Sequence, residues 1–270
     1  MIDIHSHILP GVDDGSRSLE ESLHIARQEE SGGTACIIST PHLYDGSDLS
    51  RIPLFREVRL ELQEALIQEG LQLKVLQGLE VYPFPDVLVA LDEGADLSLA
   101  GRGTHILIDT PFSQFPFDFR TFLFQLRMKG LTPILAHPER AAEFQASMSL
   151  LQEFAESGCL LQVNAGSLQG KYGPIAVSLA REILQKRMAQ FVSGDIHRPG
   201  RGPVMGRFRN FASTFLDESY IQLLTHDSAH AVIEGLPLPP RPPAPPQEEE
   251  PPSFWGKLLG KGRKPKEERI

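Results

Sequence analysis

Cysteine, positive charge and long apolar runs are all scarce in this sequence. Its two cysteines, Cys36 and Cys159, lie inside apolar runs, so a disulfide framework is not expected. We expect the protein to lie in the reducing cytoplasm. No apolar run is long enough to span a bilayer. The first residues lack a basic segment followed by an apolar stretch, so no secretory signal is expected.

Acidic residues outnumber basic ones. The chain has 35 Asp and Glu against 26 Lys and Arg, which gives a formal net charge of -9. A sequence-independent binder of nucleic acid is usually basic, so a nucleic-acid partner is not expected. At 270 residues and 41% hydrophobic content, the chain is long enough to bury a large core as one or two domains.

Short apolar runs rich in β-branched residues alternate with longer helix-like segments. The runs predict strands at residues 2–4, 35–39, 73–77, 105–108, 132–136, 159–163 and 191–193. Helical spacing of apolar residues predicts helices at 18–31, 53–69, 119–129, 147–156 and 175–187. Near-continuous apolar strands indicate an α/β fold with a parallel sheet buried on both faces. A closed or distorted barrel is favoured, and a doubly wound open sheet is the alternative.

Composition changes after about Gly235. Residues 1–235 form the predicted domain, and residues 236–270 are predicted to be a Pro-rich disordered linker with a basic and aromatic tip at 253–266. Such a tip is able to touch an anionic membrane surface or a partner protein, and the alternative is a solvated chain end.

Polar side chains follow every predicted strand. In chain order they are His5 and His7, His42, Glu80, Asp109, His137 with Glu139 and Arg140, Asn164, and Asp195 with His197. The carboxyl ends of parallel barrel strands meet on one face, where imidazoles and carboxylates together make a metal site. His5 and His7 point to the same side of an extended segment, and Asp14 lies in a Gly-bounded turn able to fold over that face.

Other polar residues have simpler interpretations. His24, His105, His226 and His230 are expected to be ordinary surface or core histidines. Asp13 is expected to form a turn, and Glu139 to support the site from outside it. Asn164 either supports its loop or contacts substrate. Arg201 either closes over a bound phosphate or is a solvated loop charge.

Several segments together resemble a known family. "MIDIHSHILPGVDDG", "TPH", "GLEVY", "AHPER", "NAGSLQGKYG" and "GDIH" are similar to the polymerase and histidinol phosphatase (PHP) superfamily, and within it to the bacterial CpsB/CapC/YwqE-type tyrosine phosphatases of capsular polysaccharide synthesis. The similarity covers about residues 1–235. It implies a distorted barrel of about seven strand–helix units, the PHP fold.

The resemblance also implies an activity and a cofactor. Family members hydrolyse phosphotyrosine in the C-terminal tail of bacterial tyrosine autokinases, which control exopolysaccharide synthesis. They use two or three divalent ions, typically Mn²⁺, with Fe, Zn or Mg as alternatives. The ligands implied here are His5, His7, Asp14, His42, Glu80, Asp109, His137, Asp195 and His197. Arg140 and Arg201 would hold the phosphate, and His42 or His197 would protonate the leaving group. Formation of an oligomer is left open.

Two departures from the family pattern stand out. Asp109 occupies a position that is usually glutamate, and "HLYDGSD" follows the second strand where more basic or His-rich residues are usual. A cysteine-dependent phosphatase is set aside, because neither Cys36 nor Cys159 is followed by a phosphate-binding loop closed by arginine.

Three other functions compete with a protein-tyrosine-phosphatase. The first is a small-molecule phosphoesterase, such as a histidinol-phosphate phosphatase. The second keeps the metal cluster but breaks another bond, as an amidohydrolase or nuclease does. The third is a scaffold with a vestigial metal site whose tail does the binding.

The C-terminal segment is predicted to be dispensable for chemistry, since every candidate site residue precedes it. Deleting residues 239–270 should leave turnover of p-nitrophenyl phosphate unchanged. A loss of more than about tenfold in steady-state kcat, a change of about 1.4 kcal/mol in the barrier, would show that the segment belongs to the active enzyme.

Overall fold

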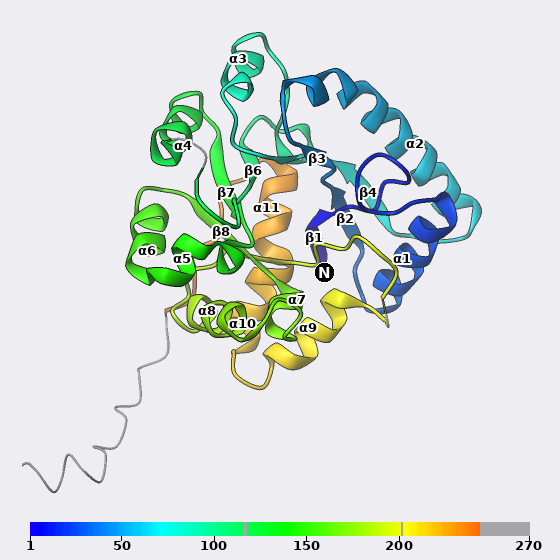
Figure 1. Cartoon of the computed structure of the whole chain (residues 1–270). Coiled ribbons are helices and arrows are strands. Elements are labelled where there is room, and N and C mark those ends of the chain that lie inside the picture. The colour runs from blue at the N-terminus through cyan, green and yellow to red at the C-terminus, as the bar shows by residue number, and fades with distance from the viewer. Residues whose placement is uncertain (116–117, 201, 244–270) are drawn as a thin grey trace, which may run out of the picture.

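Parallel strands alternate with helices along the chain, and the helices surround the strands (Figure 1). The computed structural model describes residues 1–115, 118–200 and 202–243. The strands are β1 (Ile2–Ser6), β2 (Cys36–Ser39), β3 (His42–Leu43), β4 (Lys74–Gln77), β5 (Glu80–Val81), β6 (His105–Asp109), β7 (Thr132–Ala136), β8 (Leu160–Asn164) and β9 (Phe191–Ser193).

Helices of very different length connect these strands. They are α1 (Leu19–Ser31), α2 (Ile52–Gln68), α3 (Asp86–Asp92), α4 (Phe119–Met128), α5 (Ala142–Ala146), α6 (Met148–Glu156), α7 (Ala165–Leu168), α8 (Pro174–Gln185), α9 (Val204–Ala212), α10 (Glu218–Gln222) and α11 (Ser228–Glu234). Short 3₁₀ turns lie at η1 (Gly46–Arg51), η2 (Leu99–Gly101) and η3 (Pro138–Arg140), and a π-helical turn at η4 (Leu223–Asp227).

The predicted α/β fold with parallel strands is confirmed, and the barrel is a distorted one. The strands form two sheets, ordered β1-β2-β4 and β3-β5-β6-β7-β8-β9, with every pairing parallel. The chain passes directly from β2 to β3 and from β4 to β5, so each pair acts as one strand broken near its carboxyl end. Gly78 lies at one break, where a Cβ would come within 2.7 Å of Ile38 Cγ2, so the close approach of the two strands there requires glycine.

The other edges of the two sheets meet beside β1. Ser6 and Ile196 form an isolated parallel bridge, and the N–H of His7 donates to the Ile196 carbonyl at 3.0 Å. The N–H of Asp195 donates to the His5 carbonyl at 2.9 Å. These bonds place the segment after β9 next to the end of β1, so residues almost 200 positions apart share one site.

Two apolar clusters hold the strands and helices together. The larger one lies between the strands and the surrounding helices and includes Ile37, Leu135 and Phe144. The smaller one joins strand side chains such as Ile4 and Ile134 to Val232 of α11, which crosses behind the strands in Figure 1. Burial of these aliphatic side chains is the main source of stability.

The five helices predicted from periodicity are present, with ends within about two residues of the prediction. Ser18 caps α1 by accepting from the N–H of Glu21, as a capping box requires. The Glu21 carboxylate instead accepts from the N–H of Arg17. The remaining helices have at most nine residues, too short for a clear helical period.

The segment after Gly235 begins against the domain. Leu238 packs on the smaller cluster, and Arg241 Nη1 donates to the carbonyls of Arg187 and Met188 at 2.8 and 2.7 Å. Two residues near the start of the predicted linker therefore contact the domain. Residues 244–270, with the basic and aromatic tip at 253–266, lie outside the described residues.

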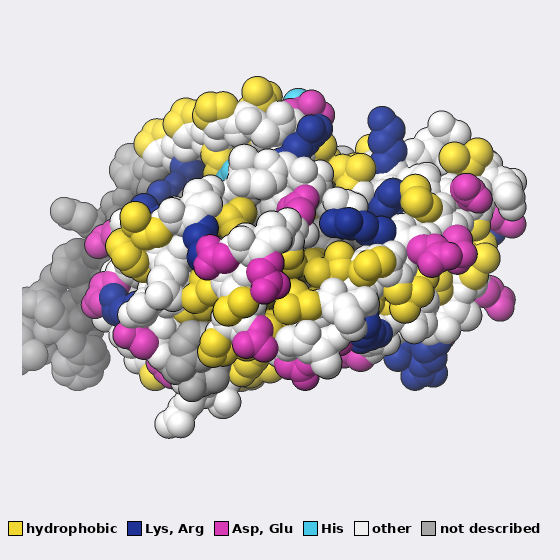
Figure 2. Space-filling model, turned by 90° about the horizontal axis from the view of Figure 1, so that it is seen from above, with side chains coloured by type: hydrophobic (Ala, Val, Ile, Leu, Met, Phe, Trp, Pro, Cys, Tyr) yellow, Lys and Arg dark blue, Asp and Glu magenta, His cyan; other side chains and the backbone are white. Residues whose placement is uncertain are grey.

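The surface is mixed in character. Figure 2 looks onto the side where α2, α3 and α4 lie, and hydrophobic side chains there share the surface with both acidic and basic ones. Scattered exposed hydrophobic groups of this kind are ordinary in globular proteins. Within the described ranges, no helix combines the length and apolar character needed to cross a bilayer.

Asp3 supplies a stability test for the junction beside β1. Its buried carboxylate accepts from the N–H of His5 and of Gly194, each at 3.1 Å. Asp3→Ala leaves both N–H donors without an acceptor, and each unsatisfied buried donor costs about 1–3 kcal/mol. We expect a lower free energy of unfolding in urea titrations.

The control is Asp92→Ala, which removes an exposed ion pair with Lys129 and should cost at most about 1 kcal/mol. Burial raises the pKa of Asp3 to about 7 in the folded state, so this carboxyl contributes less stability as pH rises from about 4 to 7. The destabilisation by Asp3→Ala should shrink over that interval. Equal free energies of unfolding for the wild type and Asp3→Ala at pH 5 would contradict the role assigned to Asp3.

Candidate metal centre

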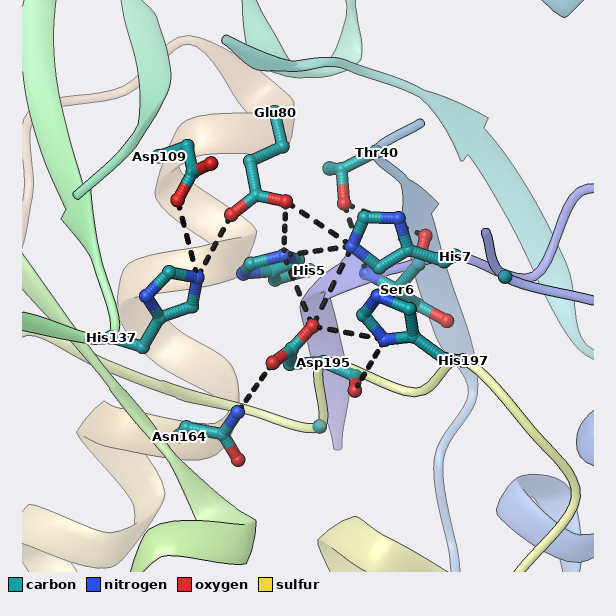
Figure 3. A network of polar contacts seen from close by, with 12 residues as sticks. His5, Ser6, His7, Thr40, Glu80, Asp109, His137, Asn164, Asp195 and His197 are labelled. Atoms are coloured by element: carbon teal, nitrogen blue, oxygen red, sulfur yellow. Dashed lines mark hydrogen bonds and ion pairs between the residues drawn. The ribbon is translucent and has the colours of Figure 1, made fainter. Parts of the chain in front are cut away.

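Side chains from the ends of successive strands converge on one cavity. His5, His7, His42, Glu80 and Asp109 come from the ends of β1, β3, β5 and β6. His137 follows β7, and Asp195 and His197 follow β9, as Figure 3 shows. The cavity has a volume of about 350 Å³ and is lined by Asp14, His42, Tyr44, Glu80, Tyr82, Asp109, Pro111, Phe112, Ser113, His137, Arg140, Asp195 and His197. The predicted residues that the structure describes are thus brought together.

The Glu80 carboxylate lies at the middle of the cluster. Its Oε2 is 3.2 Å from His5 Nε2, 3.2 Å from His7 Nε2 and 3.1 Å from His42 Nδ1, but has no well-directed hydrogen bond. Its Oε1 lies 2.9 Å from His137 Nε2. His5 Nε2 and His7 Nε2 also face each other at 3.2 Å. Several lone pairs directed at one small volume are the arrangement that a bound cation requires.

The far nitrogens of the two N-terminal imidazoles have their own partners. His5 Nδ1 lies 2.9 Å from Gln162 Oε1, and His7 Nδ1 lies 2.8 Å from Asp13 Oδ2. Each acceptor holds the proton on Nδ1 and leaves Nε2 as the ligand atom. Asp13 therefore orients His7, in addition to the turn role predicted for it, which its bond from the N–H of Gly15 provides.

The turn after His7 is packed so closely that only glycine fits at residue 15. A Cβ on Gly15 would overlap the backbone and side chain of His7. The same turn carries Asp14, whose Oδ1 lies 3.4 Å from both His42 Nε2 and His197 Nε2. Asp14 thus folds back over the strand ends and joins the cluster from the solvent side.

Asp195 divides its two oxygens between the cluster and an arginine. Oδ1 lies 3.3 Å from His197 Nδ1 and within 3.6 Å of the Nε2 atoms of the N-terminal pair. Oδ2 accepts from Arg140 Nη1 at 2.9 Å and from Asn164 Nδ2 at 2.7 Å. Asn164 therefore takes the supporting role, one of the two predicted for it. Asp195 fixes the guanidinium of Arg140 relative to the candidate ligands.

Two aromatic rings contact the Arg140 guanidinium. Its Cζ lies 4.2 Å from the centre of the Phe112 ring and 4.0 Å from that of Tyr172. Stacked rings and the bond to Asp195 leave little freedom of rotation. A charged, planar donor is thereby fixed at the cavity wall.

The backbone is strained at two of these residues. His137 has φ 36° and Asp195 has φ 47°, a left-handed region that non-glycine residues seldom adopt. The His137 carbonyl accepts from the N–H of Arg140 at 2.9 Å, and the N–H of Asp195 is bonded to β1. Strain of this kind concentrates at functional sites, where surrounding contacts compensate for it.

Charge coupling shifts several pKa values. Burial alone would lower the pKa of His5, but Glu80 and Asp195 outweigh it and raise the value to about 9. Burial lowers the pKa of His42 to about 4. Burial would raise the pKa of Glu80, but His5 and His137 hold it well below its usual range. Burial and the nearby Glu80 raise the pKa of Asp109 well above its usual range.

These donors suit a divalent cation. Three groups of side chains bring ligand atoms within 4.8 Å of one another: His7, Asp14, His42 and His197; His5, His7 and Glu80; and His42, Glu80 and Asp109. Mixed imidazole and carboxylate donors favour ions such as Mn²⁺, Fe²⁺ or Zn²⁺. His7, His42 and Glu80 each belong to two of these groups, so the three groups lie side by side.

The residues predicted to lie elsewhere do so. His24 is exposed on α1, His105 is buried at the start of β6 beside Thr104, and His226 and His230 stack on each other. Glu139 is buried outside the cavity and accepts from the N–H of Asn164 and from Ser167 Oγ. Arg201 lies outside the described residues. Both cysteines are buried, which raises each thiol pKa to about 11.

Some residues that contribute to this site were not predicted from the sequence. Gln162 lies inside an apolar strand, where one amide gives no sign of its long-range contact with His5. Tyr44 and Tyr82 were missed although a signal was present: each follows a candidate ligand by two residues, in "HLY" and "EVY". Two residues along a strand return to the same side.

Comparison with known proteins places these residues in a family. Residues 1–234 match the sequence family described as capsular polysaccharide synthesis, CpsB/CapC. The chain belongs to this family. It is 35% identical over 197 residues to the tyrosine-protein phosphatase YwqE of Bacillus subtilis, covering 73% of this chain and 77% of YwqE. It is 28% identical over 211 residues to the tyrosine-protein phosphatase CpsB of Streptococcus pneumoniae, covering 76% and 86%.

Solved structures agree with this assignment. A crystal structure from work on YwqE and CpsB, described as unique metal-dependent tyrosine phosphatases, superposes with a TM-score of 0.80 at 31% identity. It covers 91% of this CpsB/CapC chain and 99% of the solved one. The phosphotriesterase homology protein of Escherichia coli shares the fold, with a TM-score of 0.53 at 13% identity. The predicted family resemblance is confirmed.

Metal binding should release protons. With a pKa of about 9, His5 is protonated at pH 7.5 without metal, and an imidazole must be neutral to bind a cation. Affinity for Mn²⁺ should therefore rise from pH 6 to pH 9. Calorimetric titration with Mn²⁺ in HEPES and in Tris measures the release.

We expect about one proton or more per protein, and a smaller number for His5→Gln. His230→Ala is the matched control, because His230 is exposed and remote from the cluster, and it should release as many protons as the wild type. Binding heats that do not depend on the buffer would contradict this assignment.

Proposed function

We propose that this protein is a metal-dependent protein-tyrosine-phosphatase that acts in the cytoplasm on the phosphorylated C-terminal tail of a bacterial tyrosine autokinase, within capsular or exopolysaccharide synthesis. The observation that carries the proposal is the cavity where candidate ligands from six strand ends meet the fixed guanidinium of Arg140. The similarity to YwqE and CpsB, which are tyrosine phosphatases, supports the same reaction.

The proposed metal ligands are His5, His7, Asp14, His42, Glu80, Asp109, His137, Asp195 and His197, which would hold two or three ions, with Mn²⁺ the first choice. Ions bound there would lower the pKa of a coordinated water towards neutrality and offset phosphate charge. Asp109 is shorter by one methylene than the glutamate usual in the family. Its Oδ1 lies 3.7 Å from His137 Nε2, close enough for both side chains to face one ion.

Arg140 is proposed to bind the phosphate. Asp195 holds one nitrogen of its guanidinium, and the rest of the planar donor set borders the cavity. Parallel N–H donors match two phosphate oxygens, and a fixed donor stabilises charge that grows on them in the transition state. Arg201, four residues after His197 in the sequence, is a second candidate for this role.

His197 and His42 are the candidate proton donors for the leaving group. Both line the cavity and are less enclosed than the other histidines of the cluster, and burial lowers the pKa of each. A tyrosine phenolate has a pKa near 10, about five to six below an alkyl alcohol, so it departs with little help. The neutral form that burial favours suits a ligand, and an imidazole that acts as the proton donor would first take up a proton.

Turnover of a phosphotyrosine peptide from an autokinase tail tests the proposal. Activity should be absent in EDTA, return with Mn²⁺, and be lost in His137→Ala. Arg140→Lys should lower kcat/KM by about 10- to 100-fold, because lysine keeps the charge but loses the planar donor pair.

Arg120→Lys is the matched control. Arg120 also forms an ion pair and stacks on a phenylalanine, but it lies on exposed α4, and kcat/KM should stay within about twofold. Faster turnover of histidinol phosphate than of the peptide would favour the alternative, a small-molecule phosphoesterase. Activity that survives EDTA would refute the metal-dependent reaction.

A further inference from the structure

Aromatic side chains form a layer directly outside the candidate ligands. His42 pairs with Glu80 across β3 and β5, and the ladder continues because the N–H of Tyr82 donates to the Leu43 carbonyl at 2.9 Å. Residues two apart on a strand point to the same side. Tyr44 and Tyr82 therefore lie one layer beyond His42 and Glu80, towards solvent, and both line the cavity.

Phe112 extends this layer onto the next strand. It follows Asp109 of β6, which pairs with β5, and its ring centre lies 5.4 Å from that of His137. Tyr44 stacks on His42 at 4.4 Å with an interplanar angle of 21°. Tyr44 is 49% exposed and Phe112 is 50% exposed. Each ring thus has one side against the site and considerable surface open to whatever enters the cavity.

Apart from Pro111, the remainder of the cavity wall is polar. Asp195 and His197 come from the segment after β9, on the other side of the cluster from β3 and β5, and Arg140 lies next to Asp195. A bound molecule would meet ligand atoms and a guanidinium at the floor and aromatic rings on one wall. An aryl phosphate has the matching division, with a charged group at one end and a flat ring at the other.

We propose that Tyr44, Tyr82 and Phe112 form an aromatic collar that binds the phenyl ring of an aryl phosphomonoester and so selects aryl over alkyl phosphates. This inference rests on the proposed phosphatase function and adds the residues that determine its specificity. Two residues of strand rise about 7 Å, which is close to the length of a phenyl phosphate. A phosphate held by Arg140 and the ligand layer therefore places its ring at the height of the collar.

Direct binding of two non-hydrolysable probes tests the collar. Phenylphosphonate and methylphosphonate share the phosphonate group and differ in the ring. Calorimetry on the full-length, manganese-loaded protein gives the ratio of their dissociation constants. We expect phenylphosphonate to bind at least about tenfold more tightly, since an aromatic pair contributes about 2- to 10-fold per ring.

Tyr44→Leu and Phe112→Leu remove a ring but keep apolar volume at half-exposed positions. Each should reduce the ratio about 3- to 10-fold, whatever the change in methylphosphonate affinity alone, whereas Tyr44→Phe should keep the wild-type ratio. Phe124→Leu is the matched control, because Phe124 is similarly exposed on α4, outside the cavity.

The two proposals fail in different ways. An unchanged ratio in both leucine variants, with methylphosphonate still bound, overturns the collar and leaves the phosphatase proposal standing. A wild-type protein that binds neither phosphonate and does not hydrolyse the phosphotyrosine peptide overturns both.

Discussion

The site depends on one buried carboxylate, that of Glu80. A charged group in an apolar interior is tolerated only when partners surround it, and four histidines do so here. Those histidines come from β1, β3 and the end of β7. β1 belongs to one sheet, and β3 and β7 belong to the other, so Glu80 joins the two sheets of the barrel. Glu80 lies at the start of β5, which pairs with β3 and β6 just after the break between β4 and β5.

Much of this arrangement was predictable because the carboxyl ends of parallel barrel strands lie on one face. Apolar runs marked seven strands, and the residue after each run marked the face where ligands meet. The two-residue strands β3 and β5 were not predictable, since His42–Leu43 and Glu80–Val81 are too short to show a period. The contact of Gln162 with His5 spans 157 residues of sequence and depends on barrel closure, which no local pattern encodes. The contacts of Leu238 and Arg241 with the domain could not be predicted, because the proline-rich composition around them gives no sign of them.

The same contacts that orient the candidate ligands also hold the backbone in unfavourable conformations. Left-handed φ angles at His137 and Asp195 cost roughly 1–3 kcal/mol each. Arg140 N–H and the end of β1 supply compensating hydrogen bonds. The arginine that would receive the phosphate is thereby built into the turn that carries His137, so ligand position and phosphate position cannot shift independently.

Strand periodicity links chemistry to specificity in this fold. The alternation that points His42 and Glu80 into the candidate metal centre points Tyr44 and Tyr82 into the layer above them. A slip of one residue in the pairing of β3 with β5 would turn both layers away from the cavity together. The candidate ligands and the aromatic residues therefore occupy successive same-facing positions on the same strands. If the collar selects the leaving group, substitutions in this outer layer would change that preference with little loss of core packing, because Tyr44 and Phe112 are half exposed.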